Sequence, residues 1–167
     1  MDRPGQAPGY LAALEPAMRL ALAQAAGPAE AAGGPGAGDD VPVGAVVLDS
    51  GGRVIGAGRN RREADADPTA HAEIVAIRAA ATALRRWRLS DCTLVVTLEP
   101  CTMCAGAVTA ARLGRLIFGA ADARAGAAGS LWDVVRDRRI GYSVEVTGGV
   151  LAAECAALLR EFFEQRR

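Results

Sequence analysis

The segment TLVVTLEPCTMCAGAVTAARLGRLIFG, residues 93–119, carries the strongest fold signal in the chain. Residues 93–98 form a nearly unbroken apolar run, as buried strands of parallel sheets do, and residues 116–119 form a second such run. Between them, residues 101–111 have the length of a helix, which Pro100 is placed to start. A strand, a helix and a second strand in this order form a βαβ unit with a parallel pair of strands. The segment therefore predicts an α/β protein.

Two cysteines begin the predicted helix of this unit. Cys101 and Cys104 are at CxxC spacing and directly follow Pro100. They lie just past the carboxyl end of a strand, where open α/β sheets place ligands. Backbone amides in the first turn of a helix lower the pKa of a thiol and favour the thiolate that a metal requires. A CxxC pair alone would equally indicate a redox pair or half of a structural zinc knuckle.

The chain's single histidine, His71, precedes Glu73 by two residues. One imidazole and two thiolates supply three ligands to tetrahedral zinc, which is the number found when a catalytic site keeps its fourth position for water. Residues two apart on a helix point about 200° from each other, so Glu73 can stand beside the metal and move protons. We predict one Zn²⁺ per subunit, bound by His71, Cys101 and Cys104, with Glu73 as the catalytic acid and base. A structural zinc module is the alternative.

The residues before the βαβ unit predict a helix, a hairpin and a second helix. Apolar residues at helical spacing extend to about residue 26, with Pro16 in the first turn of that helix. Residues 43–48 and 53–57 flank a glycine turn and predict two antiparallel strands. Asp67 is expected to cap the next helix, with Pro68 at its first position, so that His71 and Glu73 lie in its first turn. The buried stripe of that helix is predicted to contain Ile74, Ile77, Ala81 and Leu84.

A short strand over residues 142–146 and a helix from about Val150 complete the predicted elements. Together the elements predict one domain over residues 1–167, with a sheet of five strands. Cys92 and Cys155 fall in apolar surroundings and are predicted to be small buried core residues. The apolar face of the last helix is formed by Leu151, Cys155, Leu158, Leu159 and Phe162.

Length and composition fit one globular domain. The chain has 167 residues, of which 51% are hydrophobic and 23% charged, and no apolar run approaches the 18 or so residues that a membrane helix needs. The N-terminus lacks a basic start followed by a continuous apolar stretch, so we expect a cytoplasmic protein. Residues 27–40 are rich in Gly, Ala and Pro and are predicted to be a loop. Residues 1–9 are expected to be disordered.

The formal net charge is zero and the sequence pI is about 6.6, which argues against a protein that coats nucleic acid through bulk electrostatics. Any nucleic acid must therefore be bound locally. All 19 basic residues are arginine, a side chain that binds phosphate with two nitrogens and stacks on bases. Compositional bias in a chain rich in alanine and glycine explains the arginine clusters equally well.

The motifs resemble those of the bacterial tRNA adenosine deaminase family, and the resemblance covers most of the chain. The HxE and PCxxC elements are shared by zinc-dependent nucleobase deaminases in general. GAAGSL and the FFxxRR ending are more particular to the tRNA-editing branch. The matching segments are VPVGA (41–45), Asn60, DPTAHAE (67–73), TLEPCTMCAG (97–106), Asp122, GAAGSL (126–131), ECAALL (154–159), Phe162, Phe163, Arg166 and Arg167.

This resemblance implies a three-layer α/β/α sandwich with a five-stranded mixed sheet, as in cytidine deaminases. It implies hydrolytic deamination of adenosine to inosine at the wobble position of a tRNA anticodon, with the loop nucleotide turned out into the pocket. Asn60 would hydrogen-bond the base, and Asp122, Phe163 and Arg167 would contact neighbouring nucleotides. Family members act as homodimers. Ala66 departs from the family pattern, where a polar residue can stand. The loop over residues 27–40 is an insertion relative to that pattern, since the family usually has fewer residues there.

A second enzymatic hypothesis needs the same metal chemistry without the RNA contacts. It is deamination of a free nucleobase or nucleoside, such as guanine or cytosine, and the near-neutral charge is compatible with it. The substrate separates the two hypotheses, because only tRNA editing requires an anticodon stem-loop.

Overall fold

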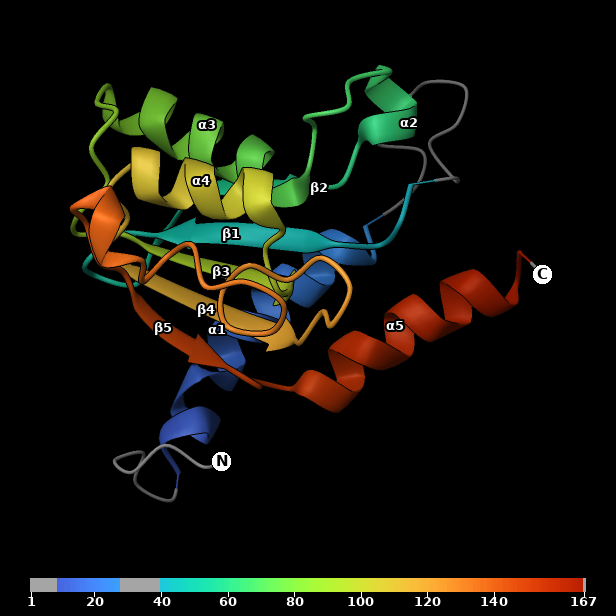
Figure 1. Cartoon of the computed structure of the whole chain (residues 1–167). Helices are drawn as coiled ribbons and strands as arrows, with labels where there is room; N and C mark the ends of the chain where they lie inside the picture. Colours follow the sequence, from blue (N-terminus) through green and yellow to red (C-terminus); the bar gives the residue numbers. More distant parts are fainter. Residues whose placement is uncertain (1–8, 28–39, 167) are drawn as a thin grey trace.

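A five-stranded mixed sheet forms the centre of the structure, in the order β2-β1-β3-β4-β5 (Figure 1). The structure is a computed structural model that describes residues 9–27 and 40–166. Residues 1–8, nearly all of the loop insertion predicted at 27–40, and Arg167 lie outside the described residues. Of the nine residues expected to be disordered, only Gly9 is described, as the residue that caps the first helix. The strands are β1 (Gly44–Leu48), β2 (Val54–Arg59), β3 (Thr93–Leu98), β4 (Arg115–Ala120) and β5 (Glu145–Gly148).

The pairing of the strands brings four carboxyl ends to one edge of the sheet. β1 pairs antiparallel with both β2 and β3, whereas β3 pairs parallel with β4 and β4 with β5. β2, β3, β4 and β5 therefore run in the same direction, and only β1 runs the other way. Functional groups that follow these strands consequently lie at the same end of the molecule.

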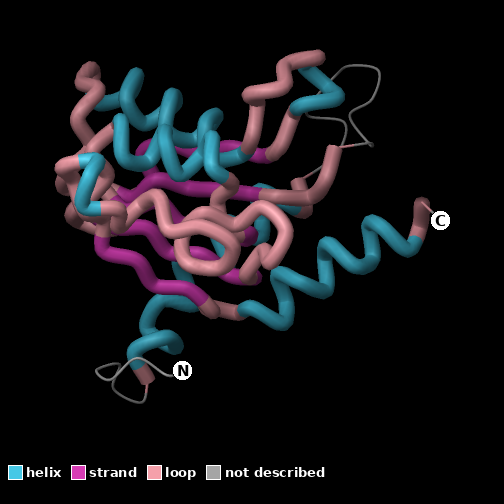
Figure 2. Tube along the Cα trace, in the orientation of Figure 1, coloured by secondary structure: helices cyan, strands magenta, loops and turns pink. Residues whose placement is uncertain are grey.

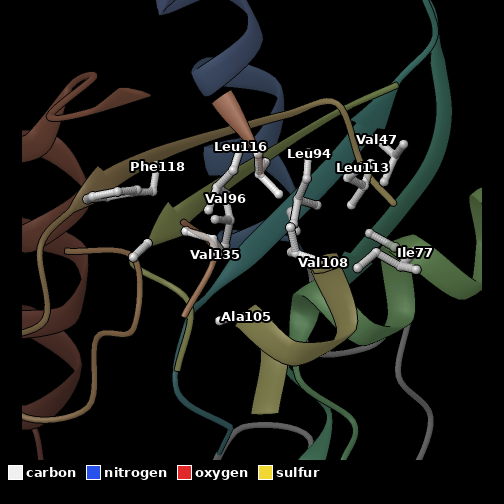
Figure 3. Packing of buried hydrophobic residues seen from close by; sticks show 14 of the residues in the cluster. Val47, Ile77, Leu94, Val96, Ala105, Val108, Leu113, Leu116, Phe118 and Val135 are labelled. Atoms are coloured by element: carbon white, nitrogen blue, oxygen red, sulfur yellow. The ribbon is translucent and has the colours of Figure 1, made fainter. Parts of the chain in front are cut away.

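Helices cover both faces of the sheet, which confirms the predicted three layers. α3 and α4 lie on one face, and α1 and α5 on the other (Figure 1). Side chains of β3 alternate accordingly: Leu94 and Val96 pack toward Val108 of α4 (Figure 3), whereas Val95 belongs to the cluster beneath α1. The helices are α1 (Tyr10–Ala25), the short α2 (Arg62–Asp65), α3 (Ala72–Leu84), α4 (Thr102–Ala110), α5 (Ala152–Glu164) and the 3₁₀ turn η2 (Arg138–Ile140).

Close packing of α3 on β2 depends on two glycines in the strand. A Cβ added at Gly58 would lie 2.6 Å from the carbonyl oxygen of Ala72, and one added at Gly56 would lie 2.4 Å from that of Ala76. Ala72, Ala76 and Ala80 are fully buried on the facing side of α3. The helix backbone therefore rests almost directly on the strand. The facing side of α3 consists of alanines because β2 approaches it this closely. Of the residues predicted for the buried stripe, only Ile77 is buried, at 8% exposure.

The segment before α3 differs from the prediction. Asp67 does not cap a helix that begins at Pro68. Its carboxylate accepts hydrogen bonds from the backbone N–H and the hydroxyl of Thr69 at 2.8 and 2.7 Å, which forms a turn instead. α3 begins at Ala72, and His71 is its extended N-cap residue.

Several other helix and strand boundaries also differ from the predicted ones. α1 begins six residues before Pro16, so this proline lies inside the helix and not in its first turn. α2 lies between the predicted hairpin and the helix expected at Pro68, where the sequence predicts no regular element. β5 begins at Glu145 and not at Tyr142, whose hydroxyl donates instead to the carbonyl groups of Arg112 and Leu113 after α4. Cys92 and Cys155 are buried as predicted, at 2% and 1% exposure.

A long irregular segment joins β4 to β5, with η2 as its helical turn (Figure 2). Its first part, residues 121–131, runs beside the start of α4, where Cys101 and Gly126 form an isolated antiparallel bridge. No helix in the described part of the chain is long and apolar enough to cross a membrane.

Candidate active site

Two helix starts meet at the common carboxyl edge of β2 and β3. His71 is the N-cap residue of α3, Cys101 is the N-cap residue of α4, and Cys104 lies in the first turn of α4. Because α3 packs on β2 while α4 follows β3 directly, the order of the strands determines how far apart these residues lie. The structure thus brings together side chains that are about 30 residues apart in the sequence.

The three side chains are spaced as ligands of one tetrahedral ion. His71 Nδ1 lies 3.7 Å from Cys101 Sγ and 3.5 Å from Cys104 Sγ. A nitrogen and a sulfur bound to the same tetrahedral zinc, at the usual bond lengths, are about 3.6 Å apart. All three ligand atoms lie within 4.8 Å of one another. A borderline-soft ion that accepts imidazole and thiolate, as zinc does, matches this donor set.

The two thiols differ in their tendency to ionise. Hydrogen bonds from Cys104, and then from His71, lower the pKa of Cys101 to about 3. The pKa of Cys104 is raised, because its proton is shared with Cys101 and because the thiol is buried. A thiolate therefore forms first at Cys101. The pKa of His71 is raised by its contact with this thiol.

Glu73 lies in the first turn of α3 with only 4% of its surface exposed. Burial raises the pKa of its carboxyl group above the ordinary value, since the charged form is deprived of water. A carboxyl group whose pKa is shifted toward neutrality can both accept and return a proton. Glu73 lines a cavity of about 180 Å³ together with His71 and Cys101.

Asn60 and Asp122, which the resemblance indicated, line the same cavity. Asn60 is 8% exposed, and its Nδ2 donates to the carbonyl oxygen of Val41 at 3.2 Å. Its Oδ1 is buried and has no hydrogen-bond partner among the described residues. A buried polar atom without a partner is costly, so this amide is held ready for a ligand that enters the cavity.

Phe163 lies outside this cavity. It is 52% exposed, and its ring meets that of Phe162 edge to face at 5.3 Å between centroids. Phe162 is partly buried, as expected for its side of the helix. Phe163 borders a separate surface hollow that also includes Arg124 and Arg166. The C-terminal end of α5 is therefore beside the loop that contains Asp122.

Two residues of the cavity wall were not predicted to have a role. Arg62 begins α2 and supplies a positive charge at the rim. Glu99 follows β3 directly and is 2% exposed. The sequence does contain a signal for Glu99, because it is an acidic residue between an apolar strand and a Pro-Cys pair. An acid buried at such a position needs several hydrogen-bond donors from other parts of the chain.

Comparison with known families supports this chemistry. Residues 15–120 match the family model described as the cytidine and deoxycytidylate deaminase zinc-binding region. The matched range contains His71, Glu73, Cys101 and Cys104.

Comparisons with individual proteins are more specific. The chain is 48% identical to the tRNA-specific adenosine deaminase of Haemophilus influenzae, over 92% of this chain and 84% of that protein. A solved structure from studies of A-to-I editing by tRNA:A34 deaminases has a TM-score of 0.73 and 42% identity, over 85% and 97% of the two chains. Guanine deaminase from Nitrosomonas europaea is similar at 26% identity and a TM-score of 0.65, over 96% and 86% of the two chains.

Proposed function

Because the chain belongs to the family of cytidine and deoxycytidylate deaminases with a zinc-binding region, we propose that it converts adenosine to inosine at the wobble position of a tRNA anticodon. It is a hydrolase. The observation that supports the substrate best is the high identity, over most of both chains, to a protein named tRNA-specific adenosine deaminase. The cavity beside His71, Cys101 and Cys104 is where the reaction takes place.

His71, Cys101 and Cys104 hold one zinc ion in this proposal, and their mutual spacing supports it. When bound, zinc supplies a Lewis acid that lowers the pKa of water from 15.7 to about 7 and so makes the nucleophile available. With three protein ligands, one position remains for water. The low pKa of Cys101 favours the thiolate that the ion needs.

Glu73 moves the protons. Water adds its oxygen to C6 of the adenine while Glu73 accepts a proton from it and delivers one to ring nitrogen N1. The C6–N6 bond then breaks while Glu73 carries the proton of the new C6 hydroxyl to the departing amine, so that C6 becomes the carbonyl carbon of inosine and the amine leaves as ammonia. Burial of Glu73 supports this role, since a carboxyl group with a raised pKa is a better proton donor in the second step.

The small volume of the cavity supports recognition of a single unstacked base. We place Asn60 against the base, because its amide has a buried atom free for a hydrogen bond. Asp122, Phe163 and Arg167 contact the flanking nucleotides, with the exposed ring of Phe163 available for stacking. We further propose that the enzyme is a cytoplasmic homodimer.

An assay of ammonia release tests the proposed substrate. We expect inosine and ammonia from an anticodon stem-loop with adenosine at the wobble position, and no ammonia from free guanine, cytosine or their nucleosides. The opposite pattern would favour the second candidate, a free-base deaminase, for which the similarity to guanine deaminase is the supporting observation.

The Glu73→Ala variant tests the mechanism. It should keep its zinc and lose deamination by a factor of about 10² or more. Glu15→Ala on the surface of α1, where Glu15 lies 4.0 Å from Arg19, is the control and should behave as wild type. A structural zinc module would release no ammonia from any substrate, even in the wild-type protein.

A further inference from the structure

Glu99 has a buried carboxylate whose hydrogen-bonding capacity is fully used. One oxygen, Oε1, accepts from the backbone N–H groups of Ala128 and Ser130, each at 3.0 Å. The other, Oε2, accepts from the backbone N–H of Asp122 at 3.0 Å and from the hydroxyl of Ser130. Two oxygens with two bonds each leave no acceptor for a substrate or for water, so Glu99 cannot move protons in the reaction.

These donors come from both ends of one loop. Asp122 stands at the start of the segment 122–130, and Ser130 stands at its end. The Glu99 carboxylate therefore joins the two ends. Asp122 and Ala125 within this loop line the cavity, so the substrate-facing wall of the cavity is attached to a single carboxylate.

The same loop also contacts the predicted metal ligand. Gly126 forms an antiparallel bridge with Cys101, and the N–H of Ala127 donates to the carbonyl oxygen of Pro100 at 2.8 Å. A Cβ at Gly126 would lie 2.5 Å from the Glu99 carboxylate, so the loop and the carboxylate are in direct contact. Glu99, Pro100 and Cys101 are consecutive, and together they hold the loop from one side.

We propose that Glu99 is a positioning residue that holds loop 122–130 against Cys101, so that the affinity for the substrate base depends on its carboxylate. The inference rests on the proposed function, since the loop faces the base. Although Glu99 is part of the cavity wall, both of its carboxylate oxygens are bound by the loop, so it acts through the loop. It therefore affects substrate binding more than it affects the chemical step.

Three variants separate positioning from general stability. Glu99→Gln keeps the size of the side chain but points an NH₂ group at backbone N–H donors. Ser130→Ala removes one hydroxyl from the same carboxylate. Glu145→Gln is the matched control, because Glu145 makes the same kind of carboxylate pair with Arg115 at the surface, at the opposite end of β4 from the loop.

The test uses zinc-loaded enzyme and measures bound zinc, melting temperature, and KM and kcat on the anticodon stem-loop. For Glu99→Gln we expect one zinc per chain, KM raised about tenfold and kcat within about threefold of wild type, the loss typical of a charge-assisted hydrogen bond. Ser130→Ala should raise KM about threefold, and Glu145→Gln should leave it unchanged. If Glu99→Gln fails to fold, the KM of Ser130→Ala tests the inference by itself.

Two results would overturn the inference. Unchanged KM in a Glu99→Gln enzyme with a lowered melting temperature would make the carboxylate purely structural. Activity that falls in proportion to bound zinc would place its effect on the metal ligand and not on the loop. Wild-type turnover of the stem-loop tests the proposed function separately. Hydrogen exchange at the amides of Asp122 and Ser130, which should quicken in Glu99→Gln, tests the loop without any substrate.

Discussion

Replacement of Gly58 by alanine should damage the active site from a distance, because Gly58 determines how closely α3 approaches β2. The new Cβ would lie 2.6 Å from the carbonyl oxygen of Ala72 and 2.8 Å from the backbone nitrogen of Ala76. Both neighbours are backbone atoms, so no side chain can rotate away. Ala72 stands between His71 and Glu73, and any displacement of the helix start moves both residues.

The magnitude follows from the contact distances. The helix must move by about 0.4 Å to reach a 3.0 Å contact and by about 0.8 Å to reach 3.4 Å. Overpacking of this kind costs about 1–3 kcal/mol, which corresponds to a melting temperature lower by about 2–12 °C in a chain of this size. Misplacement of reacting groups by 1 Å costs about 10²-fold in rate, so we expect kcat to fall by about tenfold or more.

Melting temperature, zinc content and kcat should be measured on Gly58→Ala and on a matched control, Gly106→Ala. A Cβ at Gly106 in α4 meets no described atom within 4 Å. Alanine is favoured over glycine in a helix by about 0.5–1 kcal/mol, so the control should be as stable as wild type or more so. A Gly58→Ala enzyme with wild-type melting temperature and kcat would refute the reasoning that the glycine contact positions α3.

Three further outcomes are expected. Asn60→Ala should lower kcat/KM on the stem-loop by about 10–100-fold through the loss of one buried hydrogen bond, with a melting temperature close to wild type; an unchanged kcat/KM would remove Asn60 from the base contacts. Removal of metal with a strong chelator should abolish turnover, and added zinc should restore it; full activity at less than a tenth of the metal would contradict the zinc proposal. Hydrogen bonds from Arg139 lower the pKa of Asp137 to about 2. The pair therefore stabilises the folded protein at pH values above the pKa that this carboxyl group has in the unfolded chain, and this stabilisation is lost as the pH falls through about 2. An NMR titration of the Asp137 carboxyl with a midpoint near 4 would contradict this pairing.

Local patterns were sufficient where a single segment determines its own structure. The apolar run 93–98, the small-residue helix after Pro100 and the glycine turn after β1 all appear as predicted, to within a few residues. The chemistry of the site could also be predicted from short segments, because the His-x-Glu and Cys-x-x-Cys motifs indicate which side chains can bind a metal and which can move a proton. These features depend on neighbours within about one helical turn.

Features that depend on distant neighbours were missed. The start of α3 was placed at Pro68, but Asp67 prefers the hydrogen bonds of its own turn. The glycines of β2 determine which face of α3 is buried, and the periodicity of apolar residues within the helix does not show this. The importance of Glu99 depends on donors 23 to 31 residues away in the chain.

By itself, the sequence determined the kinds of elements and the set of reactive side chains. Only the tertiary structure decided that His71 Nδ1 lies 3.7 Å from Cys101 Sγ and 3.5 Å from Cys104 Sγ. It also decided that the carboxylate of Glu99 joins both ends of a loop that lines the cavity. The physical reason is the antiparallel pairing of β1 with both β2 and β3, which points β2 and β3 the same way and brings two helix starts to one edge. Hydrogen bonds between strands are non-local, so their partners follow from the packing of the whole sheet.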